Sequence, residues 1–253
     1  GIDGYTCAAR DIEAELPQGS PISPILFIIY VSGFFSAIEE KLPIKTLSFA
    51  DDIGIIAVEN SVKETTKMLE LAGQEAVQWG LQNKINFEVD KTEAVLFTKK
   101  RKLAKEAKGA KIRLGGTTIG YNQEATRWLG IWLDNGLSFK AHYQIRLQKA
   151  KAAENRLQSL SANHGLSPGL VRRVQIAVVQ SIALYGAEIW WQGQKSWADD
   201  IQRLINRQAR AITGALKTTP IGPLVKEAAL DPAIPLLEDR QRRYTLRALK
   251  LPI

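Results

Sequence analysis

The stretch SFADDIGII (residues 48–56) places two adjacent carboxylates, Asp51 and Asp52, between two short apolar runs. The runs KTLSFA and IGIIAV predict two buried strands of a hairpin, with the acidic pair at its tip. Asp is a favoured turn residue, so an Asp-Asp pair often only closes a turn. Two carboxylates at the edge of a core also repel each other unless a cation lies between them. The pair therefore predicts a site for Mg²⁺, with Mn²⁺ as an alternative, of the kind that serves phosphoryl transfer.

An apolar helix is expected just before the hairpin. PQGSPISP (17–24) is dense in turn formers and predicts a helix with Ser23 as N-cap and Pro24 at the first helical position. The segment SPILFIIYVSGFFSAIEEKL (23–42) is apolar on nearly every side, which predicts that this helix lies inside the domain. Its apolar run of about 14 residues is shorter than the roughly 20 that a membrane span needs. We therefore expect a core helix and no membrane partner.

Near residue 134 the expected secondary structure changes from mixed strands and helices to helices alone. Before it, Ser61 and Glu64 form a capping box that begins a helix running to about Trp79. Further segments are expected as a strand (94–98), a charged loop (99–111), a hairpin (113–120) and a strand (127–134). After it, helices are expected over 139–160, from Ser167 to about 185, from a Ser196 cap to about 215, and over 235–250. The sequence predicts an α+β fold: a mixed domain at 1–133, with an antiparallel sheet packed on helices, and an all-helical domain at 134–253.

Charge is distributed unevenly between these two parts. The chain carries a net charge of +8. Residues 1–133 hold 16 Lys and Arg against 17 Asp and Glu, whereas residues 134–253 hold 18 against 9. This asymmetry predicts a polyanionic partner that binds mainly the second part. One Cys and two His exclude a disulfide framework and a Cys/His zinc site, and they predict an intracellular protein.

Two helices of the basic part carry arginines along one face. In the helix near 197–215, Arg203, Arg207 and Arg210 cluster on the order of 130° from the apolar face. The last helix repeats the pattern with Arg240, Arg243, Arg247 and Lys250. One such stripe is usually a solvated face, but two with little acid between them fit a phosphate backbone.

Two further motifs each have two interpretations. KKRK (99–102) fits a nuclear localisation signal, and a solvated loop is the commoner explanation of such a short charge run. Trp190, Trp191 and Trp197 are expected in the core and between helices rather than as base-stacking platforms.

An ordered series of blocks resembles one known family. PQGSPISPILF (17–27), followed by FADD (49–52), resembles the palm of a reverse transcriptase, best that of non-LTR (LINE-type) retrotransposons of the fungal kind. The resemblance extends over nearly the whole chain in the family's order. Its further blocks are WGLQNKINFEVDKTEAVLF (79–97), RWLGIWLDNGLSF (127–139), LYGAEIWW (184–191), RQARAITGALKTTPIGPLVKEAAL (207–230) and LEDRQRRY (237–244).

The resemblance implies a fold, an activity and partners. It implies a partial polymerase palm at 1–133 and a helical thumb or connection region at 134–253. The implied activity is RNA-directed DNA polymerisation: template-directed nucleotidyl transfer by a two-metal mechanism with Mg²⁺. The implied partners are an RNA template, a DNA primer and dNTPs.

The resemblance also implies roles for seven residues. Asp51 corresponds to a metal-binding Asp, with Asp52 beside it, and Lys91 to the lysine that neutralises or protonates the leaving pyrophosphate. Gln18 and Gly19 correspond to the motif that lines the nucleotide and template, and Leu129-Gly130 to the primer-grip turn. Without the family, Gln18-Gly19 fits a tight turn and Lys91 a solvated surface lysine.

One expected metal ligand has no counterpart here. The family carries an additional Asp on a strand upstream of the PQG block, and only Asp3 and Asp11 precede that block in this chain. Neither has the expected apolar surroundings, so we expect palm core plus thumb without the fingers, the upstream Asp or any start methionine. On its own the chain is then predicted to be inactive, with N-terminal polymerase segments of the same polyprotein as partners. The alternatives are a catalytically dead remnant that acts as a basic nucleic-acid-binding module, and an unrelated α+β protein.

Overall fold

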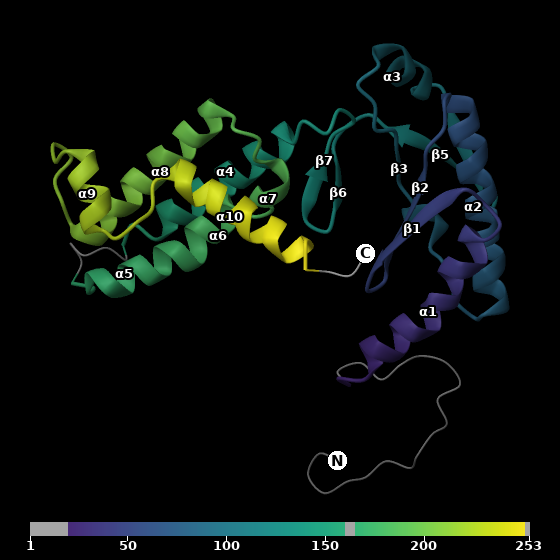
Figure 1. The fold of residues 1–253 in the computed structure, drawn as a ribbon, viewed down its shortest axis with the longest axis horizontal. Helices are drawn as coiled ribbons and strands as arrows, with labels where there is room; N and C mark the ends of the chain where they lie inside the picture. The colour runs from purple at the N-terminus through teal and green to yellow at the C-terminus, as the bar shows by residue number, and fades with distance from the viewer. Residues whose placement is uncertain (1–19, 160–164, 251–253) are drawn as a thin grey trace, which may run out of the picture. The chain divides into compact units, whose positions relative to one another are not determined.

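The computed structural model describes residues 20–159 and 165–250 of the 253-residue chain. The chain forms two compact units, Gly1–Asn122 and Gln123–Ile253, whose elements are labelled in Figure 1, and the buried side chains form separate clusters within each unit. The first mixes strands with helices and the second is mainly helical, so the α+β class is confirmed. The palm and thumb assignments remain predictions. Among the described residues, no helix combines the length and apolar character that crossing a membrane requires.

The acidic hairpin lies in the first unit between two helices. Helix α1 (Ser23–Glu39) precedes strands β1 (Ile44–Phe49) and β2 (Asp52–Ala57), and helix α2 (Val62–Gln82) follows. The strands pair antiparallel from Ile44↔Ala57 to Phe49↔Asp52. The core between these elements consists of Val31, Phe34, Ile38, Ile44, Ala72 and Ala76. The predicted start of this helix at Ser61 is confirmed, because the Ser61 hydroxyl accepts a hydrogen bond of 3.2 Å from the Glu64 amide; the Glu64 carboxylate in turn accepts from the Ser61 hydroxyl at 2.9 Å.

Helix α1 and the hairpin are less buried than the sequence predicts. The N-cap of α1 is Ile22, which makes no side-chain cap, so Ser23 is not the cap. The described residues cover one side of α1, and against them Ile25, Ile28 and Ile29 on its remaining surface are 58–64% exposed. In the hairpin, only Ile44 is buried. The reason is geometric: the two strands form a sheet of their own, and α1 and α2 cover one side of them in the described part of the chain.

A second sheet completes the first unit. After a 3-10 turn, η1 (Val89–Lys91), strand β3 (Ala94–Val95) pairs parallel with β5 (Thr117–Asn122), which pairs antiparallel with β4 (Lys111–Leu114). The predicted hairpin is confirmed, but the expected purely antiparallel sheet is wrong. The expected charged loop is also wrong in part, because it contains helix α3 (Arg101–Ala107). Leu103 and Ala107 pack into the core beside this sheet and hold the helix, while Lys102 and Lys105 are exposed.

The second unit is a helical cluster with one small hairpin. Strands β6 (Thr126–Trp128) and β7 (Ile131–Leu133) replace the single strand predicted there. The helices are α4 (Lys140–Arg156), α5 (Pro168–Val174), a π-helical turn η3 (Gln175–Gln180), α6 (Ser181–Ala183), α7 (Ala187–Trp190), α8 (Lys195–Thr213), α9 (Ile221–Glu227) and α10 (Ala233–Ala248). The residue preceding α8 is Gln194, so Ser196 is not its cap. The structural boundary precedes the predicted one at 133/134, because the hairpin packs on α4.

Candidate active site and nucleic-acid interface

The acidic pair lies at the tip of the β1–β2 hairpin, where the sequence predicts it. Phe49 and Asp52 close the hairpin, which leaves Ala50 and Asp51 as its two-residue turn. Ala50 adopts φ +52°, a left-handed conformation that two-residue hairpin turns require and that alanine rarely adopts. Asp51 and Asp52 are both exposed. The tip therefore presents two adjacent carboxylates to solvent.

The donor chemistry of this tip suits a hard divalent cation, but the set of donors is small. Mg²⁺ takes six oxygen ligands in near-octahedral geometry and usually keeps several waters. Two carboxylates with waters fit a single ion of this kind. In the described ranges, 20–159 and 165–250, no group of three or more acidic, His or Cys side chains gathers at a place that could hold a metal. The tip fits one weakly held cation better than a bridged pair.

Lys91 lies in a different part of the first unit. It ends the η1 turn, and its ammonium forms an ion pair with the Glu88 carboxylate three residues earlier. That hydrogen bond and its attraction raise the pKa of Lys91, whose side chain is 80% exposed. Its neighbour Asp90 accepts a hydrogen bond from Thr117 of β5. Lys91 therefore lies next to the second sheet. Within the described residues, its ammonium pairs with Glu88.

Gln18 and Gly19 lie outside the described residues. Their expected contact with nucleotide and template therefore stays a prediction.

The predicted primer-grip residues form the tight turn of the β6–β7 hairpin. Leu129 and Gly130 have φ values of +47° and +78° and connect the closing pair Trp128 and Ile131. Two successive left-handed residues are typical of a type I′ turn, which explains why one of them is glycine. A Cβ atom on Gly130 would lie 2.8 Å from the Tyr185 hydroxyl oxygen. The turn thus needs glycine both for its backbone and for the close approach of Tyr185.

Side chains of the helical unit hold this turn in place. The Tyr185 hydroxyl donates to the Leu129 carbonyl oxygen at 2.9 Å, and Arg146 Nη2 donates to the Gly130 carbonyl oxygen at 2.9 Å. The Arg146 guanidinium lies 4.0 Å from the centre of the Tyr185 ring, within the range of a cation–π contact. Burial is the main cause that lowers the pKa of Arg146. The two turn carbonyls are therefore clamped by one cation and one phenol.

A buried histidine connects the clamp to the helices behind it. His142 is fully buried; its Nδ1 accepts from the Trp132 amide at 3.2 Å, and its Nε2 lies 3.0 Å from the Tyr185 carbonyl oxygen. Because Nδ1 accepts, the ring is the neutral tautomer with its proton on Nε2, which donates to Tyr185. Desolvation is the main cause that lowers the pKa of His142. The sequence prediction missed Arg146, His142 and Tyr185, although the block LYGAEIWW (184–191), which contains Tyr185, was already part of the family resemblance.

The arginines of α8 are engaged with acids and carbonyls of the same unit. Arg203 pairs with Asp200 at 2.6 Å, and Arg207 pairs at 2.7 Å with Glu154 of α4, whose side chain is 7% exposed. Arg210 donates to the Lys217 carbonyl oxygen at 3.3 Å. Burial of Glu154 raises its pKa, and the Arg207 charge opposes that shift. Arg207 therefore also neutralises a buried carboxylate where α8 packs on α4.

The arginines of α10 divide into two groups. Arg243 pairs with Asp239 at 2.6 Å, and Arg240 Nη1 donates to the Leu184 carbonyl oxygen at 3.4 Å. Arg247 and Lys250 are exposed near the end of the helix. More acid accompanies these stripes than the sequence suggested, because three of the five arginines with these contacts on α8 and α10 pair with carboxylates: Arg203, Arg207 and Arg243. Their binding of a phosphate backbone stays a prediction.

The three tryptophans lie in the core or between helices, as predicted, and Trp197 is less buried than the other two. Trp190 and Trp191 are buried in the core of the second unit. Trp197 is half-buried and stacks on Tyr143 with ring centroids 4.4 Å apart and planes at 5°. The KKRK motif at 99–102 is exposed at the start of α3, and its role as a nuclear localisation signal stays a prediction.

Comparison with known proteins assigns the chain to a family. The family described as reverse transcriptase (RNA-dependent DNA polymerase) matches residues 2–133, just over half of the chain. The chain belongs to the reverse transcriptase family. The matched segment of this chain contains Asp51, Asp52, Lys91 and the Leu129-Gly130 turn. The predicted membership of the family of RNA-directed DNA polymerases is confirmed.

The curated relatives of this chain described next come from insects. The RNA-directed DNA polymerase from mobile element jockey of Drosophila melanogaster is 24% identical over 85% of this chain and 23% of its own length. The probable RNA-directed DNA polymerase from transposon BS of the same species is 29% identical over 81% of the chain and 23% of its own length. A retrovirus-related Pol polyprotein from type-1 retrotransposable element R1 of Nasonia vitripennis is 24% identical over 71% of the chain and 53% of its own length. The chain spans about a quarter of the length of the first two relatives, and no solved structure matches it.

Proposed function

We propose that this chain supplies the palm core (1–133) and the thumb (134–253) of an RNA-directed DNA polymerase from a non-LTR, LINE-type retrotransposon. Its task is to help extend the 3′-OH of a DNA primer on an RNA template with dNTPs. The observation that carries the proposal is the position of Asp51 and Asp52: both lie at an exposed hairpin tip inside the family-matched segment. A fungal source and a nuclear site of action belong to the same proposal.

The proposed site residues divide the work between them. Asp51 and Asp52 would hold Mg²⁺ or Mn²⁺, which supplies positive charge beside reacting phosphates when bound. The Leu129-Gly130 turn, with its backbone fixed by Tyr185 and Arg146, would position the primer end. Positioning contributes much of the rate in phosphoryl transfer, so a fixed turn is useful there. Lys91, Gln18 and Gly19 would meet the nucleotide, and the basic helices would hold the product duplex.

On its own the 253-residue chain should not extend a primer. In-line phosphoryl transfer by two metals needs ions about 3.5–4 Å apart that stabilise both the attacking and the leaving oxygen. The two acidic donors at the tip come from one turn of one hairpin, and within the described ranges no third joins them. We expect other polymerase segments of the same polyprotein to complete the site.

A chimera tests the proposed function. This chain replaces the corresponding segment of the jockey polymerase, and the product is assayed for extension of a labelled DNA primer on RNA with dNTPs and Mg²⁺. We expect extension by the chimera and none by its Asp51→Asn form, while a Lys45→Gln form retains activity. Lys45 lies in the same hairpin, so this substitution controls for damage to the strands. Extension by the isolated chain that is lost in Asp51→Asn would overturn the expected inactivity.

A second function is a basic nucleic-acid-binding module without catalysis. It is favoured by one observation, the absence of a third acidic donor near the tip among the described residues. A correctly folded chimera that binds primer and template but extends nothing would favour this alternative over the polymerase.

A further inference from the structure

A polar groove lies in the first unit, beside the edge strand β4. It is lined by the first half of α2, the end of α3 and the start of β4, and it has a volume of about 540 Å³. Its lining carries four cations: Lys63, Lys67, Lys111 and Arg113. Two carboxylates, Glu70 and Glu106, also line it, which leaves a net charge of +2. The groove is therefore basic, although the first unit as a whole is nearly neutral.

The cations of this groove are not neutralised within the described part of the chain. All four are exposed, and the ion pairs of the described residues involve other side chains. Of the two carboxylates, Glu70 is already engaged, because its Oε1 accepts a hydrogen bond of 2.8 Å from the Arg113 amide. A cleft lined by an excess of one charge attracts ligands of the opposite sign. The groove therefore favours an anionic ligand.

The cations form two rows with similar spacing. Lys63 and Lys67 are one turn apart on α2, a rise of about 6 Å. Lys111 and Arg113 are two residues apart on β4, a rise of about 6.6 Å, and point to the same side of the strand. In an extended peptide, side chains at alternate positions share one side with the same separation of about 6.6 Å. A segment with acidic residues at alternate positions would match either row.

The edge of β4 adds main-chain hydrogen-bonding groups to the groove. The two-residue turn at 115–116, with φ values of +55° and +85°, joins β4 to β5 through the closing pair Leu114 and Thr117. Such a closing pair is hydrogen-bonded, and bonded pairs alternate along antiparallel strands, so the amides and carbonyls of Lys111 and Arg113 point away from β5. The Arg113 amide agrees with this direction, because it donates to a carboxylate of α2. The Lys111 amide has no such partner among the described residues.

We infer that the α2–β4 groove binds an acidic peptide segment in extended conformation, with carboxylates at alternate positions facing the lysines and a main-chain hydrogen bond at Lys111. A peptide fits better than a phosphate backbone, because Lys111 presents an outward donor and an outward acceptor, and phosphates supply only acceptors. Addition of an extended segment to an exposed sheet edge is an established mode of peptide recognition. The inference concerns the first unit and does not depend on the proposed polymerase function.

The test measures binding of a fluorescein-labelled hexapeptide of alternating glutamate and threonine to the 253-residue chain by fluorescence anisotropy. The groove variant Lys67→Gln/Lys111→Gln removes one cation from each row. It should weaken binding by about tenfold, since two exposed ion pairs are lost.

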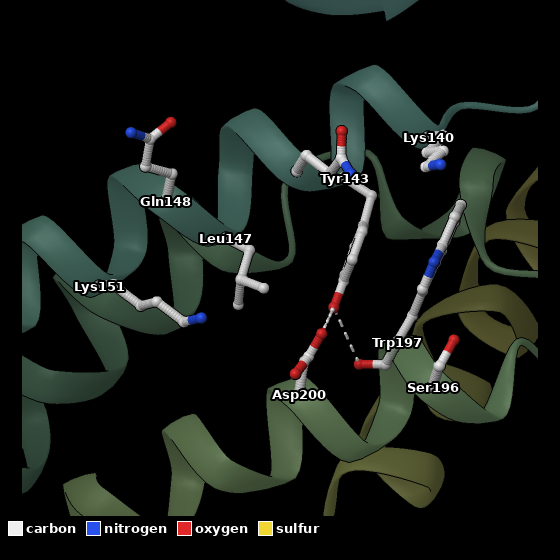
Figure 2. Close-up of a pocket in the computed structure, with 9 residues that line it drawn as sticks. Lys140, Tyr143, Leu147, Gln148, Lys151, Ser196, Trp197 and Asp200 are labelled. Atoms are coloured by element: carbon white, nitrogen blue, oxygen red, sulfur yellow. Dashed lines mark hydrogen bonds between the residues drawn. The ribbon is translucent and has the colours of Figure 1, made fainter.

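Two control variants carry the same change of charge. Lys102→Gln/Lys105→Gln changes exposed lysines of α3 outside the groove lining. Lys140→Gln/Lys151→Gln changes two lysines that line a different groove, between α4 and α8 of the second unit (Figure 2). Each control should weaken binding by less than about twofold, because salt screens exposed charges that do not contact the ligand.

Further peptides test the extended arrangement. A hexapeptide of three glutamates followed by three threonines has the same charge without the alternate spacing, and it should bind more weakly. Methylation of the backbone amides of either the glutamates or the threonines should weaken binding in one of the two cases, because alternate amides of a strand point to the same edge.

Each outcome decides the inference. Loss of affinity in the groove variant alone supports it, provided that all variants melt like the wild type by circular dichroism. Equal loss in the groove variant and the controls would mean diffuse attraction and would overturn it. Equal binding of both hexapeptides, or no effect of either methylation, would overturn the extended arrangement. Binding of a 20-base-pair DNA duplex that is lost in the groove variant, but not in Lys102→Gln/Lys105→Gln, would reassign the groove to a nucleic acid.

Discussion

At the scale of single residues, the turn at Leu129-Gly130 depends most on the identity of its side chains. Its two carbonyl oxygens are held by Tyr185 and Arg146, and Tyr185 is in turn fixed through its own carbonyl oxygen by His142 and Trp190. The contacts made by Arg146, Tyr185 and His142 span 16 to 56 positions of sequence, whereas Trp190 lies five positions from Tyr185.

Gly130→Ala should destabilise the second unit by about 2–3 kcal/mol. The left-handed backbone costs a non-glycine residue about 1–2 kcal/mol, and the new methyl group would displace the Tyr185 hydroxyl from the Leu129 carbonyl. The measurement is urea unfolding followed by tryptophan fluorescence, since five of the six tryptophans lie beyond residue 122. Gly222→Ala in α9, where an added Cβ meets nothing within 4 Å, should cause no loss. Equal stability of Gly130→Ala and wild type would show that the turn is not clamped.

The buried His142 should make the second unit less stable in mild acid. Its pKa is lowered in the fold, mainly by burial with a contribution from Arg146, although the Tyr185 carbonyl acts in the opposite direction. Below about pH 6.5 the unfolded chain therefore binds a proton that the folded chain does not, and stability falls by at most about 1.4 kcal/mol per pH unit. Unfolding experiments between pH 7.5 and 5 should show a flatter pH dependence for His142→Gln than for wild type. Identical slopes would mean that His142 does not titrate differently in the two states.

At the scale of elements, one helix packs through one face and carries charge on another. Helix α8 buries Ile201, Leu204 and Ile205 while carrying arginines on its remaining surface, as its periodicity predicts. The packing of α8 on α4 then brings Arg207 to the buried carboxylate of Glu154. Arg203, four residues earlier, instead pairs with Asp200 on its own helix. Loss of Arg207 and loss of Arg203 should therefore differ in their effect on the stability of the second unit.

Arg207→Gln should destabilise the second unit more than Arg203→Gln does. Removing Arg207 leaves the buried Glu154 carboxylate without its ion partner, which should cost about 1–2 kcal/mol after allowing for the exposure of Arg207. Arg203 forms an exposed pair, so its loss should cost less than about 1 kcal/mol. The double variant Glu154→Gln/Arg207→Gln should recover most of the loss in thermal melting. A double variant as unstable as Arg207→Gln would show that the pair itself is not the cause.

At the scale of the whole molecule, composition and structure agree on where charge accumulates. Residues 134–253 hold twice as many basic as acidic side chains, and several of the basic ones, such as Lys140, Lys151, Arg247 and Lys250, are exposed. The first unit is nearly neutral and leaves apolar side chains of α1 exposed. The two units therefore differ in the kind of surface that they present.

The intact chain should bind duplex nucleic acid mainly through the second unit and without sequence preference. With five or six phosphate contacts, the slope of log affinity against log salt should be about −4 to −5. Lysines beyond residue 134 should be protected from acetylation by bound duplex, while those before it react as in the free chain. Two duplexes of unrelated sequence should bind alike. Protection confined to the KKRK segment would move the interface to the first unit.

Local patterns in the sequence determined much of this protein's organisation. The acidic pair at a hairpin tip, the Ser61–Glu64 capping box and the two-sided character of α8 depend on residues a few positions apart, so short-range periodicity and turn chemistry are enough to predict them. The charge asymmetry needs only composition. Helix α3, which the sequence analysis assigned to a charged loop, shows the limit of this reasoning. Its two apolar side chains pack into the core beside the second sheet, and this contact stabilises a helix among lysines.

Only the tertiary structure decided the features that depend on which surfaces meet. An all-round apolar helix such as α1 does not specify its buried side, and the coverage of one side by α2 and β1 is a matter of packing. The pairing of Glu154 with Arg207 and the clamp of Arg146 and Tyr185 on the turn join residues 16 to 56 positions apart. No periodic pattern encodes such separations, since they arise when helices pack and a buried charge or carbonyl must find a partner.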